Sequence, residues 1–196
     1  SIGSKMAENK SLGKILGKGK RGVVRRGKFK GNVCAVKVPN AESTAINRLE
    51  TESFWLKELN KYNIGPEFYN FYEGSISMEY LDGVHLKDYL KTSSEIKTKS
   101  VLKKIMKQCR VMDKLKVNKF EMHRITTNVI VVKNNPVLID FERCKRVLEP
   151  KNVTQFSQFL FKKGKYGNQE KLIKLLKEYK SDFSEKSYKE LLLYFF

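Results

Sequence analysis

Short apolar runs separated by glycine-containing turns occupy the first part of the chain, a pattern typical of strands. The pattern predicts three strands within residues 10–38 and a further strand pair at 68–72 and 75–80. One helix is predicted between them, at 42–60, because its apolar residues recur every three or four positions. The first part of the chain therefore reads as a sheet with a single helix.

Helical spacing dominates the second part of the chain, which begins near residue 82. The predicted helices lie at 86–90, 100–117, 152–162, 168–180 and from about residue 187 to the end. A β-hairpin interrupts them, with strands at 129–132 and 137–139 around a four-residue turn, Lys133–Pro136. These elements together predict an α+β protein that is β-rich first and helical afterwards.

The chain is strongly basic, with 40 Lys and Arg against 21 Asp and Glu in 196 residues and a formal charge of +19. This balance favours anionic partners such as a nucleotide, a nucleic acid or an acidic protein surface. A lysine-rich composition that reflects the organism's habitat or base content is the plainer interpretation. Three widely spaced cysteines, Cys34, Cys109 and Cys144, match neither a disulfide framework nor a zinc pattern, and the first two are expected in the core.

No apolar run approaches the length of a membrane span and no signal peptide is visible, so we expect a soluble, cytoplasmic protein. Residues 1–5 precede Met6 and resemble the remnant of a tag. The remaining residues, 6–196, are enough for one compact core or for two small lobes that share a cleft. We therefore expect a single domain over 6–196.

A glycine-rich stretch near the start carries the first sign of chemistry. It reads Gly17-x-Gly19-x-x-Gly22-x-Val24, and Lys37 follows 15 residues after the last glycine. Glycine lets backbone N–H groups approach phosphate oxygens closely, and a lysine on the next strand can reach the same phosphates. A hairpin follows these glycines rather than a helix, which argues against a dinucleotide-binding turn.

Glu52 lies on the apolar stripe of the predicted helix at 42–60. A carboxylate on a buried face needs a cation, and Lys37 is the natural one. Glu50 faces another side and is the weaker candidate. The plainer alternative is a solvated glutamate at the edge of the stripe.

Two oxygen-bearing side chains flank the predicted hairpin: Asn128 opens it and Asp140 closes it, which brings both to the same end. Amide and carboxylate oxygens suit a Mg²⁺ ion that carries nucleotide phosphates. Earlier in the chain, residues 78–83 read as a connector whose backbone could bind an adenine edge, or as an ordinary strand end and turn.

The ordered set of glycine loop, strand lysine, helix glutamate, connector, Asn128 and Asp140-Phe141-Glu142 resembles the protein kinase-like superfamily. The resemblance implies a bilobal kinase-like fold, with a β-rich N-terminal lobe at about 10–81 and a shortened helical C-terminal lobe at about 82–196. It implies ATP and Mg²⁺ as cofactors, with Asn128 and Asp140 as the metal ligands. The nucleotide-binding residues that it implies are Gly17, Lys18, Gly19, Gly22, Val24, Ala35, Lys37, Met78, Glu79, Tyr80 and Leu81.

Within that superfamily the chain looks closest to the small atypical kinases of archaea, the RIO kinases and the kinase subunit of the KEOPS complex. Only 56 residues follow Asp140, and there is no Ala-Pro-Glu motif. The resemblance implies an atypical Ser/Thr protein kinase or a KEOPS-type kinase/ATPase that works with protein partners in a larger assembly.

The expected catalytic aspartate is missing. His123-Arg124 matches the start of the family's His-Arg-Asp motif, but Ile125 stands where the aspartate belongs. Glu121 or His123 could take its place as the catalytic base, and phosphoryl transfer relies mostly on positioning and charge neutralisation. The alternatives are a nucleotide-binding pseudokinase scaffold, a small-molecule or lipid-headgroup kinase of the same fold, and an RNA-binding module with a regulatory nucleotide site.

The predicted helix at 100–117 carries a basic stripe opposite its apolar face. Its members recur at spacings of 4, 3 and 4: Lys103, Lys107, Arg110 and Lys114. Such a stripe is usually a solvated face. We also consider it a candidate surface for tRNA, another RNA or an acidic partner.

Overall fold

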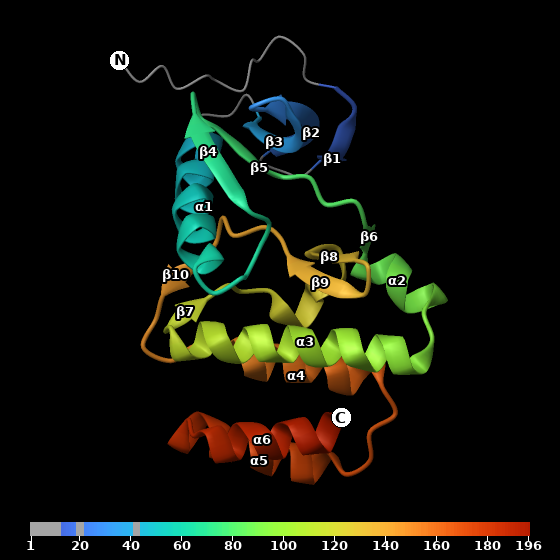
Figure 1. The fold of residues 1–196 in the computed structure, drawn as a ribbon. Helices are drawn as coiled ribbons and strands as arrows, with labels where there is room; N and C mark the ends of the chain where they lie inside the picture. Colours follow the sequence, from blue (N-terminus) through green and yellow to red (C-terminus); the bar gives the residue numbers. More distant parts are fainter. Residues whose placement is uncertain (1–12, 19–21, 41–43) are drawn as a thin grey trace. The chain divides into compact units, whose positions relative to one another are not determined.

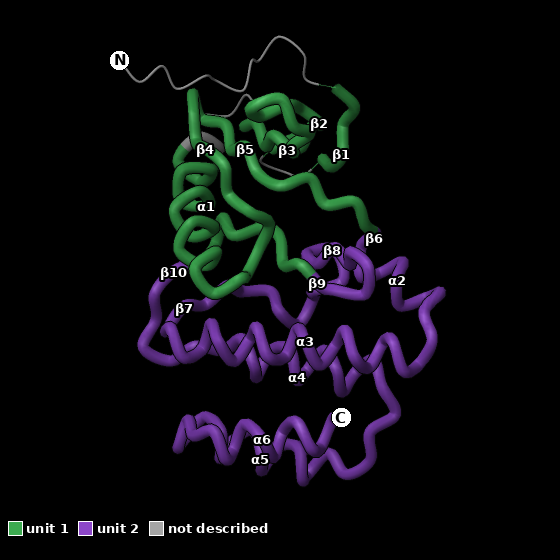
Figure 2. Tube along the Cα trace, in the orientation of Figure 1, with its two compact units in different colours: residues 1–83, 137–144 green, residues 84–136, 145–196 purple. Residues whose placement is uncertain are grey.

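The computed structural model describes residues 13–18, 22–40 and 44–196, and Figure 1 shows the order of its elements. The chain forms two compact units, which Figure 2 distinguishes by colour. The first unit contains residues 1–83 and 137–144, and the second contains residues 84–136 and 145–196.

The first unit is built on a five-stranded antiparallel sheet with the strand order β1-β2-β3-β5-β4. The strands are β1 (Ile15–Lys18), β2 (Gly22–Phe29), β3 (Asn32–Pro39), β4 (Phe68–Tyr72) and β5 (Ser75–Glu79). Tight turns join β2 to β3 and β4 to β5. Both central residues of each turn have positive φ, as two-residue hairpins of the right twist require, and a glycine takes the second position in each: Lys30-Gly31 and Glu73-Gly74.

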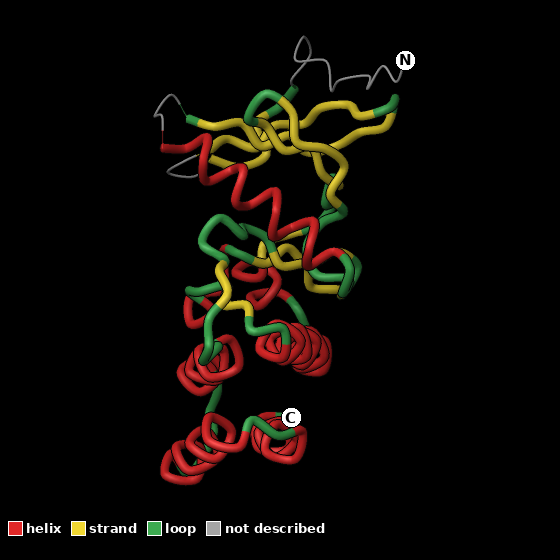
Figure 3. The backbone as a smooth tube through the Cα atoms, turned by 90° about the vertical axis from the view of Figure 1, so that its left-hand side faces the viewer, coloured by secondary structure: helices red, strands yellow, loops and turns green. Residues whose placement is uncertain are grey.

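The helix α1 (Thr44–Asn60) packs against β3, β4 and β5, as Figure 3 shows for this unit. Its buried apolar residues, Leu49, Leu56 and Leu59, are about 1% exposed and form a core with Ile76 of β5. The predicted sheet with one helix is therefore confirmed.

The second unit is mainly helical. Its helices are α2 (Leu86–Thr92), α3 (Glu95–Lys114), α4 (Asn152–Lys163), α5 (Gln169–Asp182) and α6 (Glu185–Phe195). Short strands accompany them: β6 (Val84–His85), β7 (Val117–Asn118), β8 (Val129–Val132) and β10 (Lys145–Arg146), together with β9 (Asn135–Leu138), whose last two residues belong to the first unit. A 3₁₀ helix spans Met122–Thr127, and α5 and α6 pack on each other as a hairpin.

The predicted boundaries of α3 and of the hairpin are wrong, and α3 ends at Lys114, three residues before its predicted end. Helix α3 begins five residues before its predicted start, because Ser94 caps it by accepting a hydrogen bond from the backbone N–H of Lys97 (3.3 Å). The turn of the predicted hairpin contains only Lys133 and Asn134, both with positive φ, instead of four residues. Strand β9 therefore starts at Asn135 and ends at Leu138, one residue before the predicted end.

All three cysteines are buried, so the two that were expected in the core, Cys34 and Cys109, are confirmed there. In the part of the chain that the structure describes, no helix combines the length and the apolar character needed to cross a bilayer.

Candidate active site

The centre of the candidate site is an ion pair in the first unit. The ammonium Nζ of Lys37 on β3 lies 2.7 Å from Oε2 of Glu52 on α1, and these side chains are only 14% and 4% exposed. Sheet register sets the position of the lysine, which lies between Val24 of β2 and Ile76 of β5. The predicted ion pair is therefore present, and Glu50, which is exposed, is not the partner.

The second carboxylate oxygen of Glu52 reaches a segment distant in sequence. Its Oε1 accepts a hydrogen bond from the backbone N–H of Phe141 (3.2 Å). The Phe141 side chain is 1% exposed and packs beside Gly65, where an added Cβ would lie 3.0 Å from the ring and 2.6 Å from Leu56. Glu52 thus ties β3 to the segment that contains Asp140.

Asp140 adopts an unusual backbone conformation and carries an unsatisfied oxygen. Its φ is +68°, in the left-handed region that costs most residues free energy and often marks a functional position. Its Oδ1 is buried without a hydrogen-bond partner. A buried, unpaired carboxylate oxygen is costly unless something compensates for it, and a hard cation such as Mg²⁺ takes such oxygens as ligands.

A protein-only metal cage is absent from the described residues, since no group of three or more His, Cys, Asp or Glu side chains converges there. Mg²⁺ is usually held by one or two carboxylates together with water and substrate phosphates rather than by a dedicated protein cage. The single carboxylate of Asp140 therefore fits a Mg²⁺ ion whose other ligands are nucleotide phosphates and water.

The charge state of Lys37 follows from four influences. Burial lowers its pKa, but the carboxylates of Glu52, Asp140 and Glu142 together raise it more, with Glu52 contributing the most of the three. The pKa of Lys37 is therefore above its ordinary value, and the ammonium stays charged. The sequence assigned no site role to Glu142, although it belongs to the Asp140-Phe141-Glu142 motif. Its only signal there was its position two residues after Asp140.

The glycine loop is described only at its two ends. Gly17 on β1 pairs with Val24, and nothing lies within 4 Å of the place where a Cβ would be. At Gly22 an added Cβ would lie 2.9 Å from the carbonyl oxygen of Val38, so packing requires glycine there. Lys18 ends β1 and is exposed, whereas Gly19 lies outside the described residues.

The predicted adenine-binding residues continue from the sheet into the connector. Ala35 is buried opposite Met78 on the neighbouring strand. The backbone N–H of Glu79 donates to the carbonyl of Glu67 (2.8 Å), so this N–H already has an acceptor within the protein. Tyr80 lies under the guanidinium of Arg26 at 5.8 Å, and Leu81 accepts a hydrogen bond from the N–H of Gly83 (3.1 Å).

The candidate bases, Glu121 and His123, and the second candidate metal ligand, Asn128, belong to the second unit. Phe120 and Glu121 both have positive φ, immediately before the 3₁₀ helix that contains His123. Asn128 closes this helix, and its N–H donates to the carbonyl of Ile125 (2.9 Å). Glu121, His123 and Asn128 are half-buried, which is compatible with side chains that line a reaction site. The structure brings Lys37, Glu52 and Asp140 together within the first unit.

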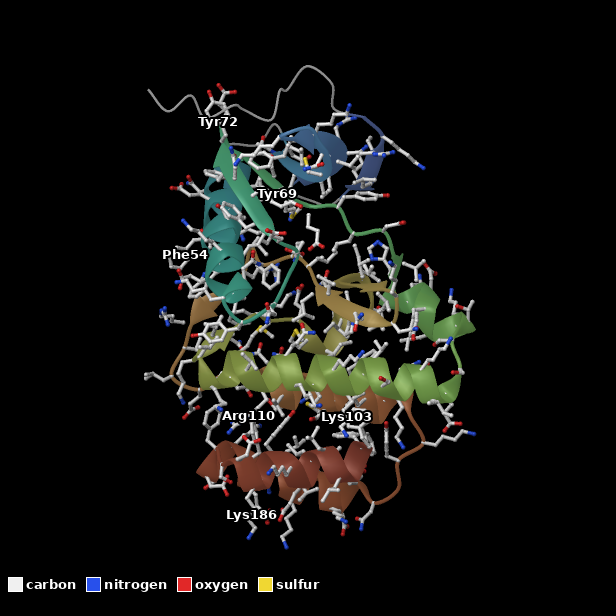
Figure 4. The ribbon with its side chains drawn as sticks, in the orientation of Figure 1. Phe54, Tyr69, Tyr72, Lys103, Arg110 and Lys186 are labelled. Atoms are coloured by element: carbon white, nitrogen blue, oxygen red, sulfur yellow. The ribbon has the colours of Figure 1, made fainter. Side chains whose placement is uncertain are left out.

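The predicted basic stripe needs a correction at Arg110, which is buried at 6% exposure. Its guanidinium donates to the Tyr179 hydroxyl (3.3 Å) and to the carbonyl of Phe183 (3.2 Å). Figure 4 shows Arg110 on α3, facing α5 and α6. Arg110 is not part of a basic surface, because α5 and α6 cover that part of α3. Lys103, Lys107 and Lys114 are exposed.

Comparison with known families agrees with this geometry. The family model for protein tyrosine and serine/threonine kinases matches residues 11–183, which is most of the chain. The chain therefore belongs to the protein kinase family, and the predicted α+β kinase-like fold is confirmed. This membership supports phosphotransfer as its reaction. A search of curated proteins finds no matching relative.

Proposed function

We propose that this protein is an ATP- and Mg²⁺-dependent phosphotransferase, a small atypical Ser/Thr protein kinase or KEOPS-type kinase/ATPase with a single domain over residues 6–196. One observation carries the proposal. Glu52 joins the buried ammonium of Lys37 to the segment in which Asp140 presents an unpaired buried oxygen. A cation for phosphates thus lies on the same scaffold as a ligand for a metal ion.

Each residue has a distinct role in this proposal. Lys37 holds the α- and β-phosphates of ATP, and Glu52 keeps the ammonium in place. Asp140 and Asn128 are the protein ligands for Mg²⁺, which supplies charge neutralisation at the phosphates when it is bound. Met78 guards the back of the adenine pocket. The remaining nucleotide contacts are assigned to Gly17, Lys18, Gly19, Gly22, Val24, Ala35, Glu79, Tyr80 and Leu81.

The catalytic base is assigned to Glu121 or His123. A carboxylate or an imidazole within hydrogen-bond reach of a hydroxyl can accept its proton. Glu121→Gln and His123→Ala, each assayed for transfer and for ATP binding, separate the two. Full transfer in both variants would show that neither residue is the base.

The deciding experiment incubates the purified protein with γ-labelled ATP, alone and with generic protein acceptors. Label on protein supports a protein kinase, free phosphate alone supports an ATPase, and tight ATP binding without either supports the pseudokinase scaffold. Asp140→Asn should remove most of the Mg²⁺-dependent activity, since asparagine tolerates positive φ but lacks the charge. The control is Asp88→Asn, at an exposed position on α2, which should leave activity unchanged.

Lys37→Ala is a less clean probe than Asp140→Asn. It would leave the carboxylate of Glu52, a residue that is 3% exposed, without its cation, so loss of activity could reflect loss of folding. The variant is informative only with a parallel measurement of stability.

Partners follow from the charge of the chain. We propose work within a larger protein assembly and contact with RNA, such as tRNA, through the exposed lysines of α3. Six of them lie along this helix: Lys97, Lys99, Lys103, Lys104, Lys107 and Lys114. The net charge of +19 supports an anionic partner.

A further inference from the structure

A buried carboxylate lies where three helices of the second unit meet. Asp113 on α3 is fully buried, and its Oδ2 accepts a hydrogen bond from the hydroxyl of Tyr179 on α5 (2.6 Å). Its Oδ1 accepts two more from Asn152, the first residue of α4: one from the backbone N–H (3.0 Å) and one from Nδ2 (2.9 Å). Asp113 therefore joins α5 to the start of α4.

Asn152 also forms hydrogen bonds with the backbone that precedes the candidate bases. Its Nδ2 also donates to the carbonyl of Val117 (2.7 Å), and its Oδ1 accepts the N–H of Lys119 (3.0 Å). Both Nδ2 hydrogens and the amide oxygen are thus used, and an aspartate could not donate those two bonds. One turn further along α4, Oε1 of Gln155 accepts the N–H of Met122 (3.2 Å), at the start of the 3₁₀ helix.

The direction of the Tyr179 hydroxyl is set by Arg110. The guanidinium donates to the hydroxyl oxygen (3.3 Å), so the hydroxyl hydrogen is left for Asp113. The guanidinium also lies over the rings of Tyr179, Phe183 and Tyr188, at 5.4, 4.8 and 5.6 Å. These contacts hold α5 and α6 on α3 and fix the tyrosine at the carboxylate.

We propose that the α5–α6 hairpin positions the candidate catalytic loop, residues 117–128, through a relay of side chains from Tyr179 to Asp113 to Asn152. Tyr179 is then a positioning residue, remote from the reacting groups. This inference rests on the proposed function, because the loop carries the candidate bases Glu121 and His123.

The relay depends on complete pairing of the buried groups. Without the tyrosine hydroxyl, Oδ2 of Asp113 keeps only the N–H of Val153 at 3.4 Å, a long hydrogen bond. A buried carboxylate that loses a donor is strongly penalised, so it shifts towards the remaining donors. Asn152 is bonded to that carboxylate twice and must follow, which moves the backbone at Val117 and Lys119.

The test is Tyr179→Phe in the full-length protein. This variant keeps the ring that packs on Arg110 and removes only the hydroxyl. The matched control is Tyr194→Phe on the same hairpin, whose hydroxyl donates at the surface to the carbonyl of Gly167 (2.8 Å). Three quantities are measured: amide hydrogen exchange at Lys119 and Met122, kcat and KM for ATP in phosphate transfer, and ATP affinity at equilibrium.

We expect faster amide exchange at Lys119 and Met122 in Tyr179→Phe and a kcat about 10- to 100-fold lower, as for a displaced catalytic group. KM and affinity for ATP should stay within about twofold, because the hydroxyl bonds to Asp113 and Arg110 in the second unit, whereas Lys37 and Asp140 belong to the first. The control should match the wild type in all three quantities. Should Tyr179→Phe fail to fold, Arg110→Lys, which loses the forked donor but keeps the charge, should give the same pattern.

Two results would overturn the relay: kcat equal to that of the control, or unchanged exchange at both amides. A fall in kcat together with a large loss of ATP affinity would also overturn it, since this combination indicates general unfolding. If the wild type binds ATP but transfers no phosphate, the proposed function fails on its own. Amide exchange then decides the relay, which is supported by faster exchange in Tyr179→Phe alone and overturned by equal exchange in the two variants.

Discussion

Replacing Glu52 by glutamine tests the ion pair at the centre of the candidate site. The substitution keeps the shape of the side chain and an oxygen for the N–H of Phe141, but it removes the charge 2.7 Å from the ammonium of Lys37. Both charged groups are largely shielded from water, so solvent can compensate little for the loss.

The expected cost follows from what remains around the lysine. Removing one partner of a buried ion pair costs about 3–5 kcal/mol when the other charge is left uncompensated. Asp140 and Glu142 also stabilise the charged ammonium of Lys37, so we expect about half of that, ~2 kcal/mol. With a urea m-value of about 2 kcal/mol/M, the unfolding midpoint should fall by about 1 M.

The assay uses the fluorescence of Trp55, the only tryptophan in the chain. It lies three residues after Glu52 on α1 and is 7% exposed, so its emission reports unfolding of the first unit. The control is Glu58→Gln on the same helix. Its carboxylate meets Lys61 at 3.0 Å in an exposed pair, which should contribute at most about 0.5 kcal/mol.

A double-mutant cycle with Lys37→Met isolates the pairwise interaction, and we expect a coupling free energy of at least about 1 kcal/mol. The reasoning would be refuted by a Glu52→Gln midpoint no lower than that of Glu58→Gln. A coupling free energy near zero would refute it as well, because the two side chains would then act independently.

Three further predictions concern other parts of the chain. Gly65→Ala should destabilise the first unit by about 2–3 kcal/mol, measured from the urea midpoint, because φ is +83° and the new Cβ would press on Phe141. The free energy of unfolding should fall above about pH 10, because burial and Asp113 raise the pKa of Tyr179 in the folded state. The unfolded chain then ionises first, so stability that is present below the ordinary tyrosine pKa is lost as the pH rises. A pH series of denaturation curves should show a flatter fall for Tyr179→Phe. Affinity for tRNA should fall steeply as the salt concentration rises, and it should be lower still in a Lys103→Glu, Lys107→Glu variant. Binding that does not depend on salt would show that these lysines only face solvent.

Much of the fold could be predicted from the sequence because it is encoded locally. Apolar spacing identified α1, α4 and α5 to within two residues at either end, and glycines placed the hairpins of the sheet. Glu52 was predictable for a related reason. A charge at a position whose helical neighbours are apolar must be buried, and burial demands a partner.

Other features depended on segments far apart in the sequence. Arg110 has the spacing of a surface residue on its own helix, yet α5 and α6, about 70 residues later, bury it among aromatic rings. The influence of Glu142 on Lys37 likewise depends on the meeting of the 140–142 segment with β3 and α1, which are distant from it in the sequence.

The sequence by itself determined where the main helices and the strands of the five-stranded sheet lie, and which charged side chains are candidates for a phosphate and metal site, whereas β6, β7, β10 and the 3₁₀ helix emerged only in the structure. The tertiary structure alone decided which polar groups pair, since periodicity reports one helix face and says nothing of the element that covers it. Asn152 and Gln155 are the clearest case. Both are ordinary polar residues in the sequence, and both gain a role only because α4 packs beside the backbone at 117–122, whose N–H and C=O groups need partners once buried.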